Sequence, residues 1–223
     1  DEADPVAAWT ERFDLLVDVA ARLNERRFSA LHFEGPGTDL TVGLVPTCTL
    51  LSARFATVDG IVHRPNLPSE EVFGAPDPQG TDGVVRATKP LVLGGTIIRG
   101  LEVEFREGRV VRLEAETGAD VLRGYVAKDD GAARLGEVAL VDGQGRIGPL
   151  DTVFFDTLLD ENAASHIALG NAYAFTAGEE DHDKLNQSAI HVDFMIGSPE
   201  VSVTGVTGDG DRAAVLAGGA WQI

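Results

Sequence analysis

Residues 84–116, VVRATKPLVLGGTIIRGLEVEFREGRVVRLEAE, decide the fold class of this chain. Polar residues alternate with β-branched ones in three segments, which predicts three β-strands because successive side chains on a strand point to opposite faces. Glu107-Gly108 predicts a tight turn between the last two segments. Strands joined by such short turns are antiparallel. The strands predicted in this region cover residues 84–93, 96–105 and 108–116.

Further strands are predicted on both sides of this region. Residues 29–33 and the alternating segment DLTVGLV at 39–45 are separated by Gly35-Pro36-Gly37, which predicts a hairpin. Later apolar or alternating segments predict strands at residues 135–141, 191–197 and 201–206.

Helices are predicted at fewer places. Apolar residues recur at helical spacing over residues 6–27, which predicts an amphipathic helix. Residues 118–128 predict a short helix. Residues 160–170 predict another, with Asp160 as its N-cap and Gly170 at its end. The expected fold is therefore α+β, strand-rich, with a mainly antiparallel sheet and a few helices.

The composition limits the classes of function. The chain has 223 residues, with 36 acidic and 18 basic ones and a formal net charge of −18, so it repels a phosphate backbone and nucleic acid is not expected as a partner. Its one cysteine, Cys48, excludes a disulfide framework and a cysteine-based zinc site. No signal-peptide pattern or long apolar run is present, so we expect a cytoplasmic protein without a membrane partner. Because the sequence does not begin with Met, we expect it to be processed or cut from a longer protein.

The strongest local signal for chemistry is the pair His191 and Asp193 in the segment AIHVDFMIG. Residues two apart on a strand point to the same face, so the imidazole and the carboxylate lie side by side. Such a pair forms half of a site for a divalent metal ion, although a surface ion pair is the alternative for the motif alone. The apolar surroundings favour a partly buried site.

Other candidates lie on neighbouring elements. Glu137 is a lone carboxylate in the apolar segment LGEVALV, where an edge-strand glutamate at the surface is the alternative. His166 lies on the predicted third helix, where a core histidine is the alternative, and we expect Tyr173 to fold back toward it after Gly170 ends that helix. Carboxylates and two histidines form the ligand set of a hydrolytic metal centre.

Acidic residues in two loop-like segments complete the candidates. Glu70 and Glu71 adjoin in NLPSEEVFGAPD, and only one of them can face a given site. A solvated loop or helix start is the alternative for this pair. Asp39 follows a tight turn, where an aspartate most often accepts hydrogen bonds from nearby backbone amides. The chain has no nucleophile-elbow, dinucleotide-binding or Walker motif.

Six collinear segments of the chain resemble the C-terminal, metal-binding part of the thermophilic-type metallo-aminopeptidase family, the group of aminopeptidases T, S and PepS. Each segment alone is modest, but their order along nearly the whole chain is specific. The segments are GPGTDLTVGL (35–44), NLPSEEVFGAPD (66–77), VRATKPL (85–91), LGEVALV (135–141), FDTLLDENAASHIALGNAY (155–173) and NQSAIHVDFMIGS (186–198). The sequence departs from the family at the short loop between Tyr173 and His191 and at residues 143–151.

The resemblance implies a dinuclear metal centre in an aminopeptidase. It carries over, residue by residue, a set of metal ligands consisting of Glu71, Glu137, His166, Tyr173, His191 and Asp193. Glu137 is expected to bridge two divalent ions, which are Zn, Co, Mn or Mg, and a water shared by both ions is expected to attack the peptide bond. Tyr173 is expected to stabilise the oxyanion and Glu70 to act as the general base.

The resemblance also implies an organisation. Residues 1–223 are expected to form one catalytic metal-binding domain of a longer two-domain enzyme. Residues 1–34 are expected to pack against, or link to, an α/β domain that precedes this part in the family. A homodimer acting on peptides with a free N-terminus is expected. The alternatives are another dinuclear metallohydrolase, such as an amidase or esterase, and an inactive dimerising fragment that binds metal only.

Overall fold

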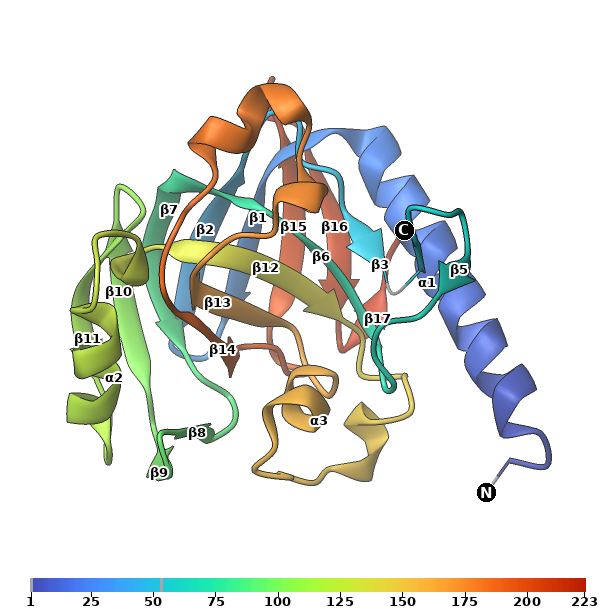
Figure 1. Ribbon diagram of the computed structural model, residues 1–223. Helices are drawn as coiled ribbons and strands as arrows, with labels where there is room; N and C mark the ends of the chain where they lie inside the picture. Colours follow the sequence, from blue (N-terminus) through green and yellow to red (C-terminus); the bar gives the residue numbers. More distant parts are fainter. Residues whose placement is uncertain (1, 53) are drawn as a thin grey trace.

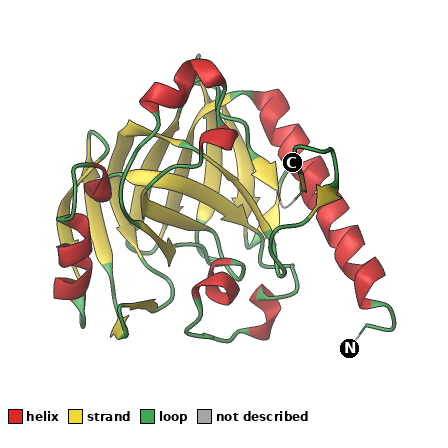
Figure 2. Cartoon of the chain, viewed as in Figure 1, coloured by secondary structure: helices red, strands yellow, loops and turns green. Residues whose placement is uncertain are grey.

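The computed structural model describes residues 2–52 and 54–223, which form two large β-sheets with helices at the periphery (Figures 1 and 2). The eight-stranded sheet has the order β11-β10-β7-β2-β1-β15-β16-β17, and the five-stranded sheet has the order β14-β13-β12-β6-β3. Every strand pair in them is antiparallel, as the sequence predicts. The fold class predicted from the sequence, strand-rich α+β, is confirmed.

The strands of the eight-stranded sheet are β1 (Phe28–Gly35), β2 (Thr38–Leu44), β7 (Pro76–Arg86), β10 (Glu102–Arg106), β11 (Arg109–Glu114), β15 (Ser202–Thr207), β16 (Arg212–Ala217) and β17 (Ala220–Trp221). Those of the five-stranded sheet are β3 (Leu51–Ser52), β6 (Glu71–Gly74), β12 (Leu135–Val141), β13 (His166–Gly170) and β14 (His191–Met195). Two small hairpins pair β4 (Phe55–Ala56) with β5 (Val62–His63), and β8 (Leu91–Leu93) with β9 (Thr96–Ile98). The helices are α1 (Pro5–Arg26), α2 (Ala119–Val126) and α3 (Thr157–Glu161), with short 3-10 turns at Gly131–Ala133, Gly148–Leu150, Ala174–Thr176 and Glu179–Lys184.

The hydrophobic core lies between the two sheets. Leu31, Phe33 and Leu40 of the large sheet belong to the same buried cluster as Ile167 and Phe194 of the small one. Side chains alternate along each strand, so the small sheet has a second face that points away from this core. That second face carries the candidate site.

Helix α1 confirms the helix predicted over residues 6–27. The Asp4 side chain accepts a hydrogen bond from the Ala7 amide at its start, Pro5 occupies the first turn, and Arg27 ends it in the left-handed region. The buried face of α1 includes Phe13, Leu16 and Leu23, at the helical spacing that the sequence indicates. The predicted helix at 118–128 is likewise present as α2.

The predicted hairpin turns are also present. β1 pairs with β2 around Gly37, and β10 pairs with β11 around Glu107 and Gly108. Both residues of the second turn have positive φ, at 48° and 75°, which is the conformation of a two-residue turn that matches strand twist. The long predicted strands at 84–93 and 96–105 are each interrupted, because β7 ends at Arg86 and β9 ends at Ile98.

The helix predicted over residues 160–170 is wrong. Helix α3 ends at Glu161, and His166 to Gly170 form the fully buried strand β13. The N-cap of α3 is Asp156, whose side chain accepts a hydrogen bond from the Leu159 amide. Asp160, the predicted N-cap, instead accepts hydrogen bonds at its carboxylate from the Phe154 and Asp156 amides. A short apolar segment that is buried on both faces has no hydrophobic periodicity by which a strand can be told from a helix. Residues 166–170 form a strand because they pair with β12 on one side and β14 on the other. Gly170, at φ 109°, therefore ends a strand.

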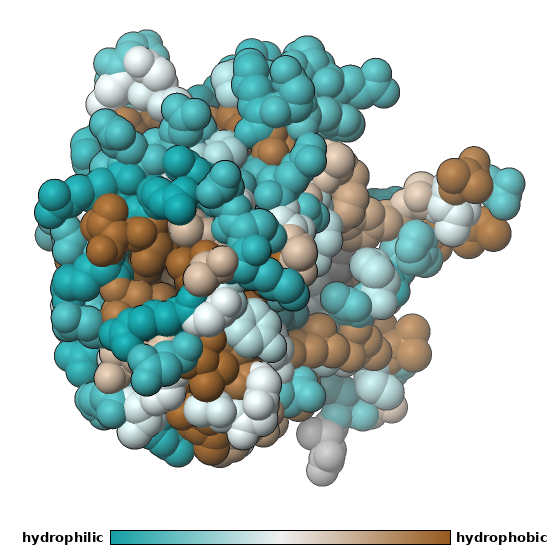
Figure 3. All heavy atoms as spheres, turned by 60° about the vertical axis from the view of Figure 1, so that its left-hand side comes forward, coloured by the Kyte–Doolittle hydropathy of each residue, from teal (hydrophilic) through white to brown (hydrophobic). Residues whose placement is uncertain are grey.

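The surface agrees with the acidic composition. On the face in Figure 3, hydrophilic residues predominate and hydrophobic ones gather in smaller patches. Across residues 2–52 and 54–223, no helix has the length and apolar character needed to cross a membrane.

Candidate metal centre

The pairing register of the small sheet brings the candidate side chains to one face. Residues paired across an antiparallel ladder point to the same side. Glu137 is paired with Ala168, and Ala168 is paired with Asp193. His166 pairs with Ala139, two residues from Glu137, and His191 pairs with Gly170, two residues from Ala168. All four polar side chains therefore share the face that points away from the core.

Glu71 reaches the same face from the other side of β12. It pairs with Val141, which lies four residues beyond Glu137 and so has the same orientation. The positions among these charged groups are small: Ala139, Ala168 and Gly170. Because these residues have short side chains or none, the longer ones around them can converge above the sheet.

The converging side chains line one cavity of about 240 Å³. The residues predicted as ligands are all there: Glu71, Glu137, His166, Tyr173, His191 and Asp193. His166 and Tyr173 thus meet at one cavity, as expected, although His166 lies on a strand and not on the predicted helix.

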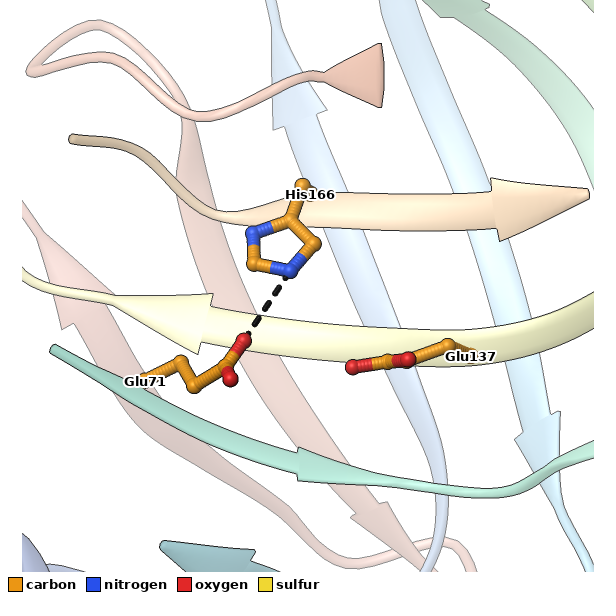
Figure 4. A group of neighbouring side chains, drawn as sticks. All are labelled: Glu71, Glu137 and His166. Carbon is orange, nitrogen blue, oxygen red and sulfur yellow. Dashed lines mark ion pairs between the residues drawn. The ribbon is translucent and has the colours of Figure 1, made fainter. Parts of the chain in front are cut away.

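Short contacts connect the imidazoles with the carboxylates. The Nε2 atom of His166 lies 3.1 Å from a carboxylate oxygen of Glu71, with Glu137 close by on β12 (Figure 4). The Nε2 atom of His191 lies 3.2 Å from Glu137 and 3.5 Å from Asp193. The Nε2 atom of each histidine therefore faces carboxylate oxygens.

The other ring nitrogens fix the orientation of both histidines. Nδ1 of His166 lies 3.1 Å from the carbonyl oxygen of Ala164, and Nδ1 of His191 lies 2.8 Å from that of Asn171. A ring whose Nδ1–H donates to a backbone carbonyl presents Nε2 as the ligand atom. This is the arrangement that metal-binding histidines commonly have.

Burial and charge shift the proton affinities of these groups strongly. Burial raises the pKa of Glu137, and the neighbouring charge of Glu71 adds to that rise. Burial alone would lower the pKa of His166 and His191, but adjacent carboxylates raise them to about 10 and about 11. Burial opposes ionisation of Asp193, yet the hydrogen bond from His191 lowers its pKa. The site thus concentrates negative charge that only cations can balance.

Aromatic side chains form one wall of the cavity. Tyr173 stacks on Phe175 with ring centroids 5.3 Å apart, and its ring lies 5.1 Å from the His191 ring. Phe55 and Phe73 contact Phe175 edge-on. Burial and then the charge of Glu137 raise the pKa of Tyr173 to about 12, so its hydroxyl keeps its proton at neutral pH.

Glu70, which the sequence analysis assigned as general base, does not line this cavity. Its fully buried carboxylate pairs with Arg12 and accepts a hydrogen bond from the Arg146 amide. The assignment is wrong because adjacent residues point in opposite directions, and Glu71 is the one facing the cavity. Asp39 is 78% exposed and lies beside His32, away from the site.

Glu161 is a site residue that the sequence analysis missed. It comes from the end of α3, lines the cavity, and has a pKa raised to about 8, mainly by burial. It was hidden because a glutamate one position after an apparent N-cap is ordinary in a helix. Glu161 lies five residues before His166. This spacing indicates a shared site only if His166 is known to begin a strand, as it does in the structure.

Among the residues that the structure describes, three groups of side chains could hold a metal ion, and each pair of groups shares one residue. In each group the potential ligand atoms lie within 4.8 Å of one another. Glu137 belongs to two groups, as do His166 and Asp193. The groups are Glu71, Glu137 and His166; Glu137, His191 and Asp193; and Glu161, His166 and Asp193.

The sequence of this chain is similar to those of known proteins from one family. The family model of thermophilic metalloproteases (M29) matches residues 1–221. Aminopeptidase T of Thermus aquaticus is 49% identical over 229 residues, covering 100% of this chain and 56% of that protein. Aminopeptidase PepS of Streptococcus thermophilus is 43% identical, with the same two coverages. The chain therefore spans little more than half the length of these curated relatives.

Solved structures extend the comparison. Wild-type AmpT from Thermus thermophilus superimposes with a TM-score of 0.94 at 47% identity, over 98% of this chain and 56% of that chain. A 2,5-dihydroxypyridine dioxygenase from Pseudomonas putida KT2440 superimposes with a TM-score of 0.62 at 16% identity, which shows a shared fold alone.

The family model matches almost the whole chain, and the fold is shared with a solved structure of that group over 98% of its residues. The chain belongs to the thermophilic metalloprotease family, M29. The family resemblance found in the sequence is confirmed.

Proposed function

We propose that this chain is the catalytic domain of a metal-dependent aminopeptidase with a dinuclear centre. The observation that carries the proposal is the set of three overlapping ligand groups in one cavity. The names of the relatives, aminopeptidase T and aminopeptidase PepS, support the exopeptidase assignment. Residues 1–223 are proposed to act as one domain.

The residues present fit two divalent cations. Carboxylate oxygens and imidazole nitrogens suit Zn, Co, Mn or Mg, and no thiolate is needed. Glu137 links the ligand group that contains Glu71 to the one that contains His191, so we assign it as the bridging ligand. It is 5% exposed and has a raised pKa, and an anion so buried is stable only beside positive charge. One ion would be held by Glu137 together with Glu71 and His166. The other would be held by Glu137 together with His191 and Asp193.

Divalent ions held by these residues would lower the pKa of a bound water and polarise the scissile carbonyl. The chain's own residues then orient the substrate and handle its protons. The protonated hydroxyl of Tyr173 is suited to donate a hydrogen bond to the developing oxyanion. We therefore assign Tyr173 as a hydrogen-bond donor, and ligation of a metal ion is the alternative.

Glu161 joins the proposed site, and Glu70 is no longer assigned as the general base. It lies in the third ligand group with His166 and Asp193, so we assign it as an additional ligand. Glu70 contributes from outside the cavity, because its carboxylate is already paired.

The proposed substrates are peptides with a free N-terminal amine. The names of the relatives, aminopeptidase T and aminopeptidase PepS, support this class of substrate. We also propose a homodimer, on the strength of the family, with light scattering at micromolar concentration as its test.

The function is tested by depleting the full-length protein of metal with a chelator and adding back Zn, Co, Mn or Mg. We expect release of N-terminal residues to stop on depletion and to return with at least one of these ions. A matched pair of peptides, one free and one N-acetylated, provides the control for exopeptidase action. Activity that survives exhaustive chelation would exclude the metal-dependent assignment, and equal cleavage of both peptides would favour another metallohydrolase.

A further inference from the structure

A buried cluster of three charged side chains lies beside the candidate metal centre. The guanidinium of Arg12, on α1, pairs with Glu70 at 2.5 Å and with Asp142 through another of its nitrogens. The exposed fractions of these side chains are 8%, 0% and 3%. This Arg12 cluster does not line the cavity, and nothing in the proposed chemistry uses it directly.

The cluster joins neighbouring ends of two strands that carry candidate ligands. Glu70 immediately precedes Glu71, the first residue of β6, and Asp142 immediately follows Val141, the last residue of β12. Val141 and Glu71 are register partners. Arg12 therefore holds the neighbouring ends of β6 and β12 from a third element, helix α1.

Hydrogen bonds extend the Arg12 cluster to a third ligand segment. The Glu70 amide donates to the side-chain oxygen of Asn162 at 2.5 Å, and the Asn162 side chain donates to the Leu158 carbonyl at 2.8 Å. Asn162 directly follows Glu161. The position of Glu161 at the end of α3 is thus connected to the backbone of Glu70.

The loop at residues 143–146 completes the surroundings of Glu70. The Arg146 amide donates to the Glu70 carboxylate, and Gly145 has no room for a Cβ because it would overlap that carboxylate. Both oxygens of Glu70 therefore have partners, Arg12 on one and the Arg146 amide on the other. The carboxylate is held rigidly.

Stability alone is a poor explanation for this cluster. Buried ion pairs lose about as much in desolvation as they gain in attraction, and apolar residues of similar size often stabilise a protein better. Helix α1 already packs through Phe13, Leu16 and Leu23. By contrast, Glu71 and Glu137 are carboxylates of one ligand group and repel each other when ionised, so their close placement needs rigid support.

We propose that Arg12 is a positioning residue for the metal centre, acting through Glu70 and Asp142 on Glu71, Glu137 and Glu161. The inference rests on the proposed function, because it explains the close placement of these carboxylates by metal binding. Supporting residues of this kind commonly change metal affinity by about 10–100-fold when removed.

The test compares Arg12→Met with Arg22→Met in the full-length protein. Arg22 lies on the same helix and pairs with Asp18, but both side chains are more than half exposed, so it is a matched control. In protein shown to be folded by circular dichroism, we expect Arg12→Met to weaken Zn²⁺ affinity by about 10–100-fold. We expect Arg22→Met to change it by less than about twofold. Asp142→Asn, which keeps a hydrogen-bond acceptor, provides a milder variant if Arg12→Met does not fold, and a smaller loss in the same direction is expected.

A readout without metal separates this inference from the proposed function. In crystals of the metal-free proteins, the 3.1 Å contact between Glu71 and His166 should open in Arg12→Met and persist in Arg22→Met. If wild-type protein binds no divalent ion but the contact opens, the proposed function fails and the positioning role stands. If folded Arg12→Met keeps both the wild-type affinity and that contact, the cluster is merely structural and the inference is overturned.

Discussion

The carboxylate of Glu71 on β6 lies 3.1 Å from the imidazole of His166 on β13, although β12 runs between their strands. The two side chains meet above Ala139, which pairs with Phe73 on one side and with His166 on the other. A methyl group at this position leaves the space in which they meet. The charged contact thus depends on an apolar residue that takes no part in it.

A larger residue at this position should therefore close the site. We expect Ala139→Leu to separate Glu71 from His166 and to remove at least one equivalent of bound metal. Overpacking should also lower the free energy of unfolding by about 1–3 kcal/mol. Metal analysis of the purified variant, beside Ala139→Ser as a small control, provides the measurement. Full metal content in the leucine variant would contradict the role of Ala139 as a spacer.

Glu137→Gln tests the bridging carboxylate. The amide keeps the shape but removes a charge and one anionic oxygen, so we expect loss of at least one metal equivalent and a fall in kcat of about 100-fold or more. Without metal, the substitution removes a buried like charge beside Glu71 and Asp193. The variant should therefore melt below wild type with metal, and level with or above it in chelator.

Thermal melts of both proteins in the two conditions check this reversal, with the exposed Glu25→Gln as control. Two tightly bound ions and full activity in Glu137→Gln would exclude bridging.

The metal-free protein should lose stability as the pH rises. The pKa of Glu161 in the fold is about 8, above its ordinary 4.5, so the folded state holds a proton that the unfolded state releases in this range. The pKa of His166 is about 10 against an ordinary 6.5, so its contribution is full below 6.5 and is lost as pH rises through about 10. Both shifts have the same sign.

We accordingly expect a lower melting temperature at about pH 9 than at about pH 6 in chelator. Excess Zn²⁺ should weaken or reverse that trend, because metal ligands must be deprotonated and affinity rises with pH. A melting temperature that rises with pH in chelator would contradict the shifts.

Tyr173→Phe separates hydrogen-bond donation from metal binding. With its pKa raised to about 12, the phenol keeps its proton, and a donor to the oxyanion contributes about 100–1,000-fold to kcat. We expect that loss in kcat with unchanged metal content and little change in KM. Loss of a metal equivalent in the phenylalanine variant would instead make Tyr173 a ligand.

We expect Glu161→Gln to affect mainly metal binding and Glu70→Gln to affect mainly the stability of the fold. The first should weaken metal binding and leave folding nearly intact, because Glu161 lines the cavity. The second should lower the free energy of unfolding by about 3–5 kcal/mol, because it leaves Arg12 buried with only part of its counter-charge. Urea unfolding and metal titration of both variants check the contrast, and matching effects of the two would refute it.

Much of the fold could be predicted from local pattern. The alternation in residues 84–116 and the Glu107-Gly108 turn predict antiparallel strands correctly, because each strand there has one face toward the core and one toward solvent. Strand β13 could not be predicted in the same way. It is buried on both faces, so its residues carry no alternation, and only its neighbours β12 and β14 determine its structure.

For the candidate site too, local sequence pattern predicts some residues and not others. His191 and Asp193 share a strand face, which a spacing of two residues predicts. Glu161 and the true environment of Glu70 depend on how distant segments pack, and no local pattern contains that information. The choice between the adjacent residues Glu70 and Glu71 as ligand came from the family resemblance, and the structure places Glu71 in the cavity.

The alternation along β12 has a consequence for insertions and deletions. Glu137 faces the cavity while Val138 faces the core, so shifting the strand by one residue would exchange the two. A carboxylate would enter the hydrophobic interior and a valine the acidic cavity in the same event. The number of residues within β12, β13 and β14 is therefore fixed more strictly than the identity of most of them.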